Sequence, residues 1–128
     1  MSRVVHFEIH ADQPERAIQF YRSVFEWEFV AFPGEDDYWF IRTGDSSWQP
    51  GIDGGLVRRQ TTLDGNSVSA FVCTISVDDL DRYLMKVRAS GGQLAGPKRA
   101  VQGIGWLAYA VDTEGNRFGM MQPDEDAG

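Results

Sequence analysis

The sequence has little of what several classes of protein require. It holds one cysteine, Cys73, so no internal disulfide can form, and the chain is expected in a reducing compartment such as the cytoplasm. No apolar run approaches the roughly 20 residues that a membrane-spanning helix needs. The first residues also lack the apolar segment of a signal peptide. Cys73 lies in an apolar strand pattern and is predicted to be a small buried side chain.

Basic residues are also few. The chain has 12 Lys and Arg against 19 Asp and Glu, which gives a net charge of −7. The resulting field repels the phosphates of nucleic acids and of anionic lipids. We therefore expect neither a nucleic-acid partner nor a membrane partner, while the acidity favours a cationic small molecule only weakly.

The chain does have enough residues and apolar content for one domain, with 128 residues of which 42% are hydrophobic. Residues 4–25 organise it, as a strand followed by an amphipathic helix. Side chains alternate between two faces of a strand, so residues 5, 7 and 9 form an apolar face. The opposite face carries His6, Glu8 and His10. It is either the solvated face of an antiparallel strand or the lining of a cavity.

Turn residues and apolar periodicity divide the rest of the chain. Asp12 is predicted to cap a helix that ends near residue 25, with Glu15 as its capping-box partner. Asp78 is predicted to cap a second helix that ends near residue 90. Strands are predicted at 4–10, 28–32, 38–43, 52–58, 69–77, 106–111 and 118–122, with an interrupted extended segment at 93–101.

The resulting order, βαβββ, occurs twice. When Asp12 is aligned with Asp78, at an offset of 66, the apolar positions of the first strand fall on apolar positions again. Such a duplication usually means two modules whose sheets join. We therefore predict a single α+β domain of two βαβββ modules, with mixed sheets that form an open cup and helices outside. The predicted divisions are module one at about 3–58, a linker at 59–68, module two at about 69–123 and a frayed acidic tail at 124–128.

Three segments resemble the vicinal-oxygen-chelate superfamily, which includes glyoxalases, bleomycin-resistance proteins and extradiol dioxygenases. They are HFEIHADQPERAIQFYRSVFEWEF near the start, VDDLDRYLMKVRASGG at the restart of the repeat, and DTEGNRFGMMQP near the end. The resemblance covers about residues 3–123. It implies paired βαβββ modules, an open barrel-like cleft and a homodimer. It also implies that enzyme members hold a metal ion.

The resemblance places the metal ligands of such enzymes on inward positions of the first and last strands of each module. Here these slots hold His6, with Glu8 two residues on, then Gly55, Val72 and Gly119. Three of the four slots offer no ligand, and two donors alone make a poor divalent site. We expect no metal cofactor; if one binds, it is Zn, Ni, Mn or Fe on His6 and Glu8. His10 is predicted to be a solvated strand-end residue.

Aromatic residues make up 12% of the chain and suit an apolar pocket with a few polar anchors. His6 and Glu8 are the predicted anchors, and the Glu8 carboxylate is expected to raise the pKa of His6. The predicted apolar ligand contacts are Trp39, Trp106, Tyr109 and Met121. Each aromatic could instead belong to the core or to a subunit interface. The strand phase leaves open which of Trp106 and Tyr109 faces inward.

No catalytic residue is assigned, because no nucleophile has a partner and the glycines of IDGGLV lack the features of a phosphate loop. The predicted function is that of a glyoxalase-like or bleomycin-resistance-like protein that binds a small molecule in the cleft without a catalytic metal. The alternative is a divalent-metal-dependent lyase, isomerase or dioxygenase. A third possibility is a structural module with a filled cleft. Whether the chain is an enzyme stays open.

Overall fold

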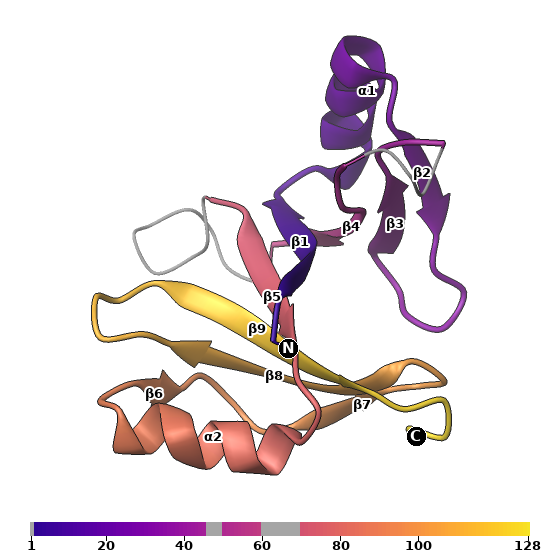
Figure 1. Ribbon diagram of the computed structural model, residues 1–128. Coiled ribbons are helices and arrows are strands. Elements are labelled where there is room, and N and C mark those ends of the chain that lie inside the picture. Colours follow the sequence, from indigo (N-terminus) through magenta and orange to yellow (C-terminus); the bar gives the residue numbers. More distant parts are fainter. Residues whose placement is uncertain (1, 46–49, 60–69) are drawn as a thin grey trace. The chain divides into compact units, whose positions relative to one another are not determined.

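The computed structural model describes residues 2–45, 50–59 and 70–128 (Figure 1). The chain folds as two compact units, which we call the N-terminal module, His6–Val72, and the C-terminal module, Met1–Val5 with Cys73–Gly128. Most of the predicted linker 59–68, with its Asp-Gly turn, lies outside the described residues. No helix in the described part of the chain is long and apolar enough to cross a bilayer.

The elements follow the predicted order, so the α+β class and the duplicated arrangement are confirmed. They are β1 (Val4–Ala11), α1 (Pro14–Phe25), β2 (Glu28–Ala31), β3 (Tyr38–Arg42), β4 (Gly54–Arg58), β5 (Val72–Ser76), α2 (Leu80–Ala89), β6 (Gln93–Leu94), β7 (Arg99–Val101), β8 (Gly105–Val111) and β9 (Arg117–Pro123). The extended segment predicted at 93–101 is two short strands, because Gly96, at φ 129°, and Pro97 separate them.

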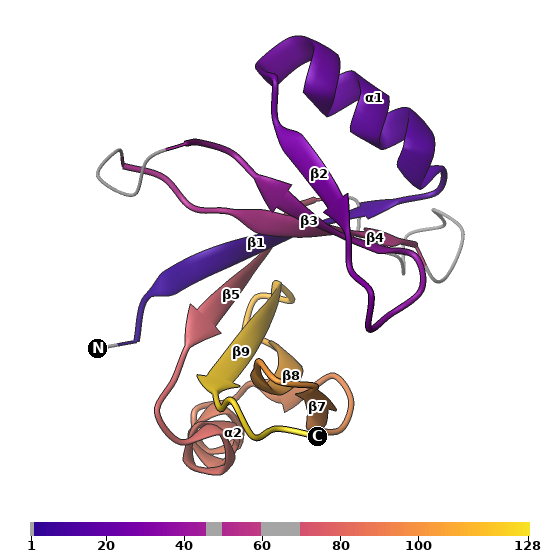
Figure 2. The same ribbon diagram turned by 90° about the vertical axis from the view of Figure 1, so that its right-hand side faces the viewer.

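The N-terminal module is a mixed sheet with α1 on one face (Figure 2). Its strand order is β2-β3-β4-β1; β1 runs parallel to β4, and the other pairs are antiparallel. The register sets Glu8 opposite Gly55 and Ile9 opposite Leu56. The core on the helix side consists of Phe7, Ile9, Ala11, Ile18, Ile41 and Leu56. Alternation along β1 therefore leaves His6, Glu8 and His10 on the face that α1 does not cover, which we call the polar face.

The C-terminal module repeats this plan. Its strand order is β5-β9-β8-β6, with β7 also paired to β8, and again the first strand, β5, runs parallel to the last, β9. The helix α2 packs on one face of this sheet over a core of Val77, Leu80, Ala108, Ala110 and Met120. The register sets Thr74 opposite Gly119, as Glu8 stands opposite Gly55 in the other module.

The start of α1 differs from the prediction. Gln13, not Asp12, is the N-cap, and its side chain makes no capping hydrogen bond. The Asp12 carboxylate instead pairs with Arg59, with Nη1 and Oδ1 3.0 Å apart. Arg59 also donates to the carbonyl oxygen of His10 at 2.9 Å. The predicted cap is wrong because this ion pair takes the carboxylate away from the helix and fixes the residue after β4 to the end of β1.

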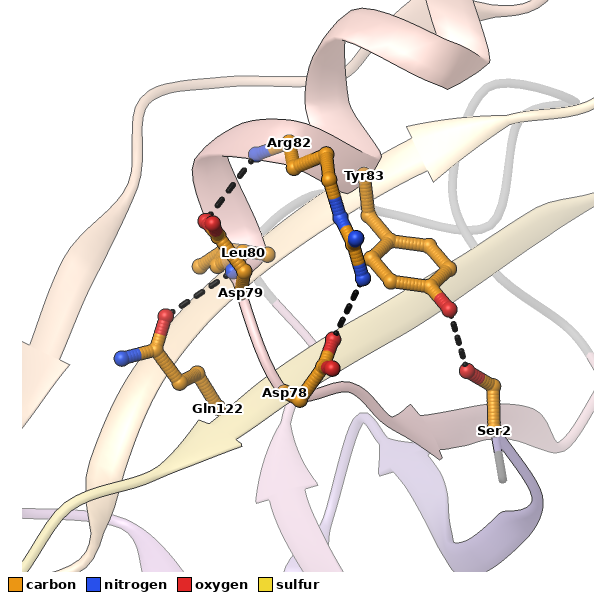
Figure 3. A network of polar contacts seen from close by, with 7 residues as sticks. All are labelled: Ser2, Asp78, Asp79, Leu80, Arg82, Tyr83 and Gln122. Carbon is orange, nitrogen blue, oxygen red and sulfur yellow. Dashed lines mark hydrogen bonds and ion pairs between the residues drawn. The ribbon is translucent and has the colours of Figure 1, made fainter.

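Side chains from two segments, residues 78–82 and β9, hold the start of α2 (Figure 3). Asp79, not the predicted Asp78, is the N-cap and accepts from the N–H of Arg82 at 3.2 Å. The side-chain oxygen of Gln122, in β9, accepts from the N–H of Leu80 at 2.8 Å. Asp78 pairs with the Arg82 guanidinium at 2.9 Å. Because the first N–H groups of a helix lack partners within it, these contacts satisfy two of them and tie α2 to β9.

The N-terminal residues are held against α2 and β5. The hydroxyl groups of Ser2 and Tyr83 lie 2.8 Å apart (Figure 3). The carbonyl oxygen of Arg3 accepts from the N–H of Ser76 at 3.0 Å. The chain therefore starts in the C-terminal module and enters the N-terminal module at His6.

Two further sequence predictions are wrong in the C-terminal module. Cys73 is exposed, because the core of this module begins at Ile75, two residues further along β5. The acidic tail is not frayed: Ala127 is 3% exposed, and its carbonyl oxygen accepts from the N–H of Gly103 at 3.0 Å. Asp124 accepts from the indole N–H of Trp106 at 3.1 Å. These contacts fold the tail back on its own module.

Asp112 organises the turn between β8 and β9. Its Oδ1 accepts from the N–H groups of Glu114 at 2.8 Å and Asn116 at 2.9 Å. Its Oδ2 accepts from the side-chain amide of Asn116 at 3.1 Å. These hydrogen bonds, first those from Asn116, lower the pKa of Asp112.

We expect Asp112→Ala to lower the Tm at pH 7, because the turn loses these hydrogen bonds. A carboxyl group whose pKa is lowered by folding stabilises the chain above its unfolded pKa, and the contribution is lost as the pH falls through the folded value. The difference in Tm from wild type should therefore shrink in acid. Thermal unfolding followed by circular dichroism over a range of pH checks this. The control is Asp36→Ala, which removes another exposed acidic side chain from a turn. A difference that does not change with pH would contradict the role of the carboxylate.

Candidate functional site

The polar face of β1 joins two of its three ionisable side chains in a close polar contact. Nε2 of His10 lies 2.9 Å from Oε1 of Glu8, and the two side chains are 19% and 10% exposed. A carboxylate so far from water requires partners of this kind. The prediction that His10 is a solvated strand-end residue is therefore wrong, because the buried carboxylate two residues away on the same face binds it.

His6 is half-buried at the other end of this row. Its Nε2 lies 3.5 Å from the hydroxyl of Tyr38. Burial lowers the pKa of His6 and outweighs the Glu8 and Asp53 carboxylates, which raise it. The sequence predicts the effect of Glu8 but not the larger effect of burial. At neutral pH His6 is mainly a neutral imidazole, which donates at one ring nitrogen and accepts at the other.

Tyr38 covers Gly55 on the same face. A Cβ atom added at Gly55 would overlap the Tyr38 hydroxyl and lie 2.6 Å from its Cζ. Phe32 and Phe40 hold the phenol edge-on, with ring centroids 5.8 and 5.9 Å from that of Tyr38. The phenol therefore fills the space that a side chain at position 55 would need.

The C-terminal module has a similar arrangement at Gly119. The register sets this glycine opposite Thr74 on one side and Tyr109 on the other. A Cβ atom added there would lie 3.2 Å from Oγ1 of Thr74 and 3.3 Å from Cε1 of Tyr109. Val72, at the start of β5 and two residues before Thr74, is 2% exposed and apolar. In both modules a glycine of the last strand thus lies under a tyrosine of the neighbouring antiparallel strand.

Comparison with known proteins gives matches among solved structures, whereas no family model and no curated protein matches the sequence. The methylmalonyl-CoA epimerase of Mycobacterium tuberculosis has a TM-score of 0.65 at 18% identity, over 94% of this chain and 87% of that one. A variant of the Streptomyces coelicolor methylmalonyl-CoA epimerase, in complex with 2-nitronate-propionyl-CoA, has a TM-score of 0.68 at 15% identity, over 98% and 97%. A hypothetical protein of Bacillus halodurans has a TM-score of 0.63 at 12% identity, over 99% and 98%.

Methylmalonyl-CoA epimerases belong to the vicinal-oxygen-chelate superfamily, so these likenesses bear directly on the resemblance found in the sequence. This chain has the vicinal-oxygen-chelate fold. The fold that the resemblance implies is thereby confirmed. At identities of 12–18% the likeness concerns the fold, and the chemistry has to be argued from the side chains.

The vicinal-oxygen-chelate fold implies a metal site in its enzymes, and the side chains of this chain do not fit one. Of the four slots only His6 carries a donor, since the two glycines and Val72 offer none. Glu8, the nearest further donor, is bound to His10. Among the residues that the structure describes, no three His, Cys, Asp or Glu side chains come together as a metal site. A catalytic divalent ion takes about three protein ligands, which this set does not supply.

The two tryptophans predicted to contact a ligand lie on the helix sides of their sheets. Trp39 packs against the core of the N-terminal module and lines a groove beside α1 with Ile18 and Phe29. Trp106 packs against the core of the C-terminal module. Trp39 therefore does not share the polar face with His6 and Glu8.

Tyr109 and Met121 lie on the face of the C-terminal sheet that α2 does not cover. Met121 stands opposite Leu107, and Tyr109 stands opposite Gly119. The phase that the sequence leaves open is thereby settled, since Tyr109 and not Trp106 shares the face of Gly119. That Tyr109 and Met121 line one ligand site with His6 and Glu8 stays a prediction.

Sequence reasoning missed Tyr38. The strand YWFIR has aromatic side chains in both phases, so either phase puts an aromatic on each face. Ile41 decides the phase: it is 1% exposed in the helix-side core, which puts Trp39 with it and Tyr38 opposite. The signal was present, because a branched apolar residue near the middle of the sheet is a stronger core marker than an aromatic residue.

Proposed function

We propose that this protein binds a small organic molecule on the polar face of β1, through its own side chains and without a catalytic divalent metal. The observation that carries the proposal is the covered glycine: the phenol of Tyr38 fills the place of a ligating side chain at Gly55. His6 supplies a polar group beside it. Phe40, on the same face and 38% exposed, supplies apolar surface.

His6 and Glu8 have different roles in this proposal. The half-buried imidazole of His6 donates to or accepts from a ligand directly. Glu8 is 8% exposed and paired with His10, so it acts by fixing His10 and by setting the charge of the face. This division supports a binding site more than a chelating one, because the carboxylate is already bound within the protein.

The ligands of similar structures suggest one chemical class to test. Two methylmalonyl-CoA epimerase structures among the matches hold acyl-CoA molecules, one 2-nitronate-propionyl-CoA and the other methylmalonyl-CoA. The phosphates of CoA would meet a chain of net charge −7, which disfavours them. We therefore propose that any shared recognition concerns the acyl group rather than the nucleotide.

We further propose that the protein acts as a cytoplasmic homodimer with a glyoxalase-like or bleomycin-resistance-like binding role. An exposed thiol at Cys73 suits a reducing compartment. Size-exclusion chromatography with light scattering gives the oligomeric state directly, and a monomer at micromolar concentration would contradict the dimer.

Thermal unfolding with a panel of compounds tests the binding proposal. A ligand that binds the folded chain raises the Tm by mass action. In a panel of propionyl-CoA, phenylacetamide, phenethylamine, Zn²⁺ and Mn²⁺, we expect an organic compound to raise the Tm. His6→Ala should abolish the rise and leave the unliganded Tm nearly unchanged.

Trp39→Phe, on the opposite face of the sheet, is the matched control and should keep the rise. A rise with the divalent cations alone, lost in His6→Ala, would reject the proposal. It would support a metal-dependent lyase, isomerase or dioxygenase instead.

A further inference from the structure

We infer that Tyr38 determines the specificity of this site: its hydroxyl and His6 together recognise the oxygen of an uncharged carbonyl group, as in an amide or ester. The inference rests on the proposed function and adds the ligand class. It starts from the disagreement between the donor set and the metal site that the fold implies. At the slot of Gly55 a carboxylate would bind a cation, whereas the phenol of Tyr38 that lies there donates a hydrogen bond to an oxygen.

The position of the phenol is set by the backbone. Gly55 is held opposite Glu8 by the β1–β4 register, so any side chain there would project onto the polar face. A Cβ atom at Gly55 overlaps the Tyr38 hydroxyl, so phenol and side chain exclude each other. In the other module Tyr109 also lies against a glycine, but a Cβ atom at Gly119 would be 3.3 Å from its ring, which is a close contact and not an overlap.

The hydroxyl points toward His6. The distance of 3.5 Å between the Tyr38 hydroxyl and Nε2 of His6 is at the outer limit of a hydrogen bond, where direct contact is weak. A ligand oxygen placed about 2.8 Å from each atom would bond to both more strongly than they bond to one another. The two groups therefore form a pair suited to one shared oxygen.

Tyr38 is also held in place before any ligand binds. Phe32 and Phe40 pack edge-on against its ring, at interplanar angles of 74° and 86°. Asp37, just before it, has φ 56°, a left-handed conformation that is uncommon outside glycine. The Arg58 guanidinium fixes Asp37, with Nε 3.2 Å from Oδ2. A preorganised donor loses less entropy on binding, which favours a role in recognition.

The charges around the pair disfavour an anionic ligand. Glu8 and Asp53 both act electrostatically on His6, so a ligand carboxylate would be repelled. An ammonium group only donates, so it cannot accept the hydrogen bond that the Tyr38 hydroxyl offers. A carbonyl oxygen accepts that hydrogen bond without the repulsion, and its aromatic or apolar body rests on Phe40.

Imidazole NMR tests this inference, because the chain has two histidines and both lie on the polar face. The probes are phenylacetamide, phenylacetate and phenethylamine, which share a ring and differ in the charge of the polar end. We expect phenylacetamide to shift the His6 signals with a Kd of about 1 mM, typical of a ligand of this size. Tyr38→Phe keeps the ring and should weaken binding about five- to tenfold, the value of one hydrogen bond.

Gly55→Ala is a second variant, which leaves Tyr38 in the chain but adds a Cβ atom that displaces its hydroxyl. It should weaken binding to a similar extent. Trp39→Phe should leave the affinity unchanged. An unchanged affinity in Tyr38→Phe, with loss in His6→Ala, would overturn the inference and leave the proposed function standing. Tighter binding of phenylacetate or phenethylamine, or no His6 shift with phenylacetamide, would overturn the ligand class.

Discussion

Leu56→Ala should lower the free energy of unfolding by about 2–5 kcal/mol, the range measured for buried leucines. Leu56 is 0% exposed and lies in β4, opposite Ile9 on one side and Trp39 on the other. Ile9 and Trp39 are held in place by their strands, and Ile18 of α1 packs against the same core. The cavity left by the truncation therefore collapses only in part. Urea unfolding followed by circular dichroism measures the loss.

Leu80→Ala is the matched variant in the C-terminal module. Leu80 is also 0% exposed and sits at the start of α2 in a separate core cluster, so a similar loss is expected. Met85→Ala, in the same helix at 72% exposure, is the control and should stay within about 0.5 kcal/mol of wild type. A loss below about 1 kcal/mol for Leu56→Ala would contradict the assigned core of the N-terminal module.

Gly55→Glu combined with Tyr38→Ala is expected to bind divalent cations more tightly than the wild-type chain does. The first change adds a carboxylate at a last-strand slot beside His6 and Glu8, and the second removes the phenol that fills its space. Loss of an outer-shell partner alone costs a metal site 10–100-fold in affinity, so a gained ligand should improve affinity by about 100-fold or more. Titration with Co²⁺, followed by its visible absorption, measures this.

The two single variants complete the test. Gly55→Glu alone forces the new side chain against the phenol, so we expect a lower Tm and a small gain in affinity. Tyr38→Ala alone opens the space without adding a donor, so we expect no gain. Comparison of all four proteins gives the coupling between the two positions. Additive effects would show that phenol and carboxylate do not compete for one space.

The alternation of the first strand and the duplication were sufficient to predict much of this molecule. Residues 5, 7 and 9 could be assigned to one face because their alternation with polar residues is unbroken. The restart at Asp78 could be found because the same order of elements follows it. Gly55 and Gly119, which the resemblance places in equivalent slots, also have equivalent positions in the sheets, since Gly55 stands opposite Glu8 and Gly119 opposite Thr74.

Features that depend on long-range partners could not be predicted. Asp12 is a residue type that commonly caps helices. Its carboxylate is bound instead by Arg59, 47 positions later, and the residues next to Asp12 do not show this. The tail looks disordered by composition, yet Asp124 meets the Trp106 indole. Each of these outcomes is a choice among local possibilities that tertiary contacts decide.

Titration of the wild-type protein with Zn²⁺, while the imidazole signals of His6 and His10 are followed by NMR, tests most directly whether the polar face works without a metal. We expect equimolar Zn²⁺ to leave the His6 signals in place, and the dialysed protein to retain far less than one equivalent. Phenylacetamide should shift the same signals in a parallel sample. One equivalent of retained zinc that shifts His6 and is lost in His6→Ala would contradict a metal-free binding site.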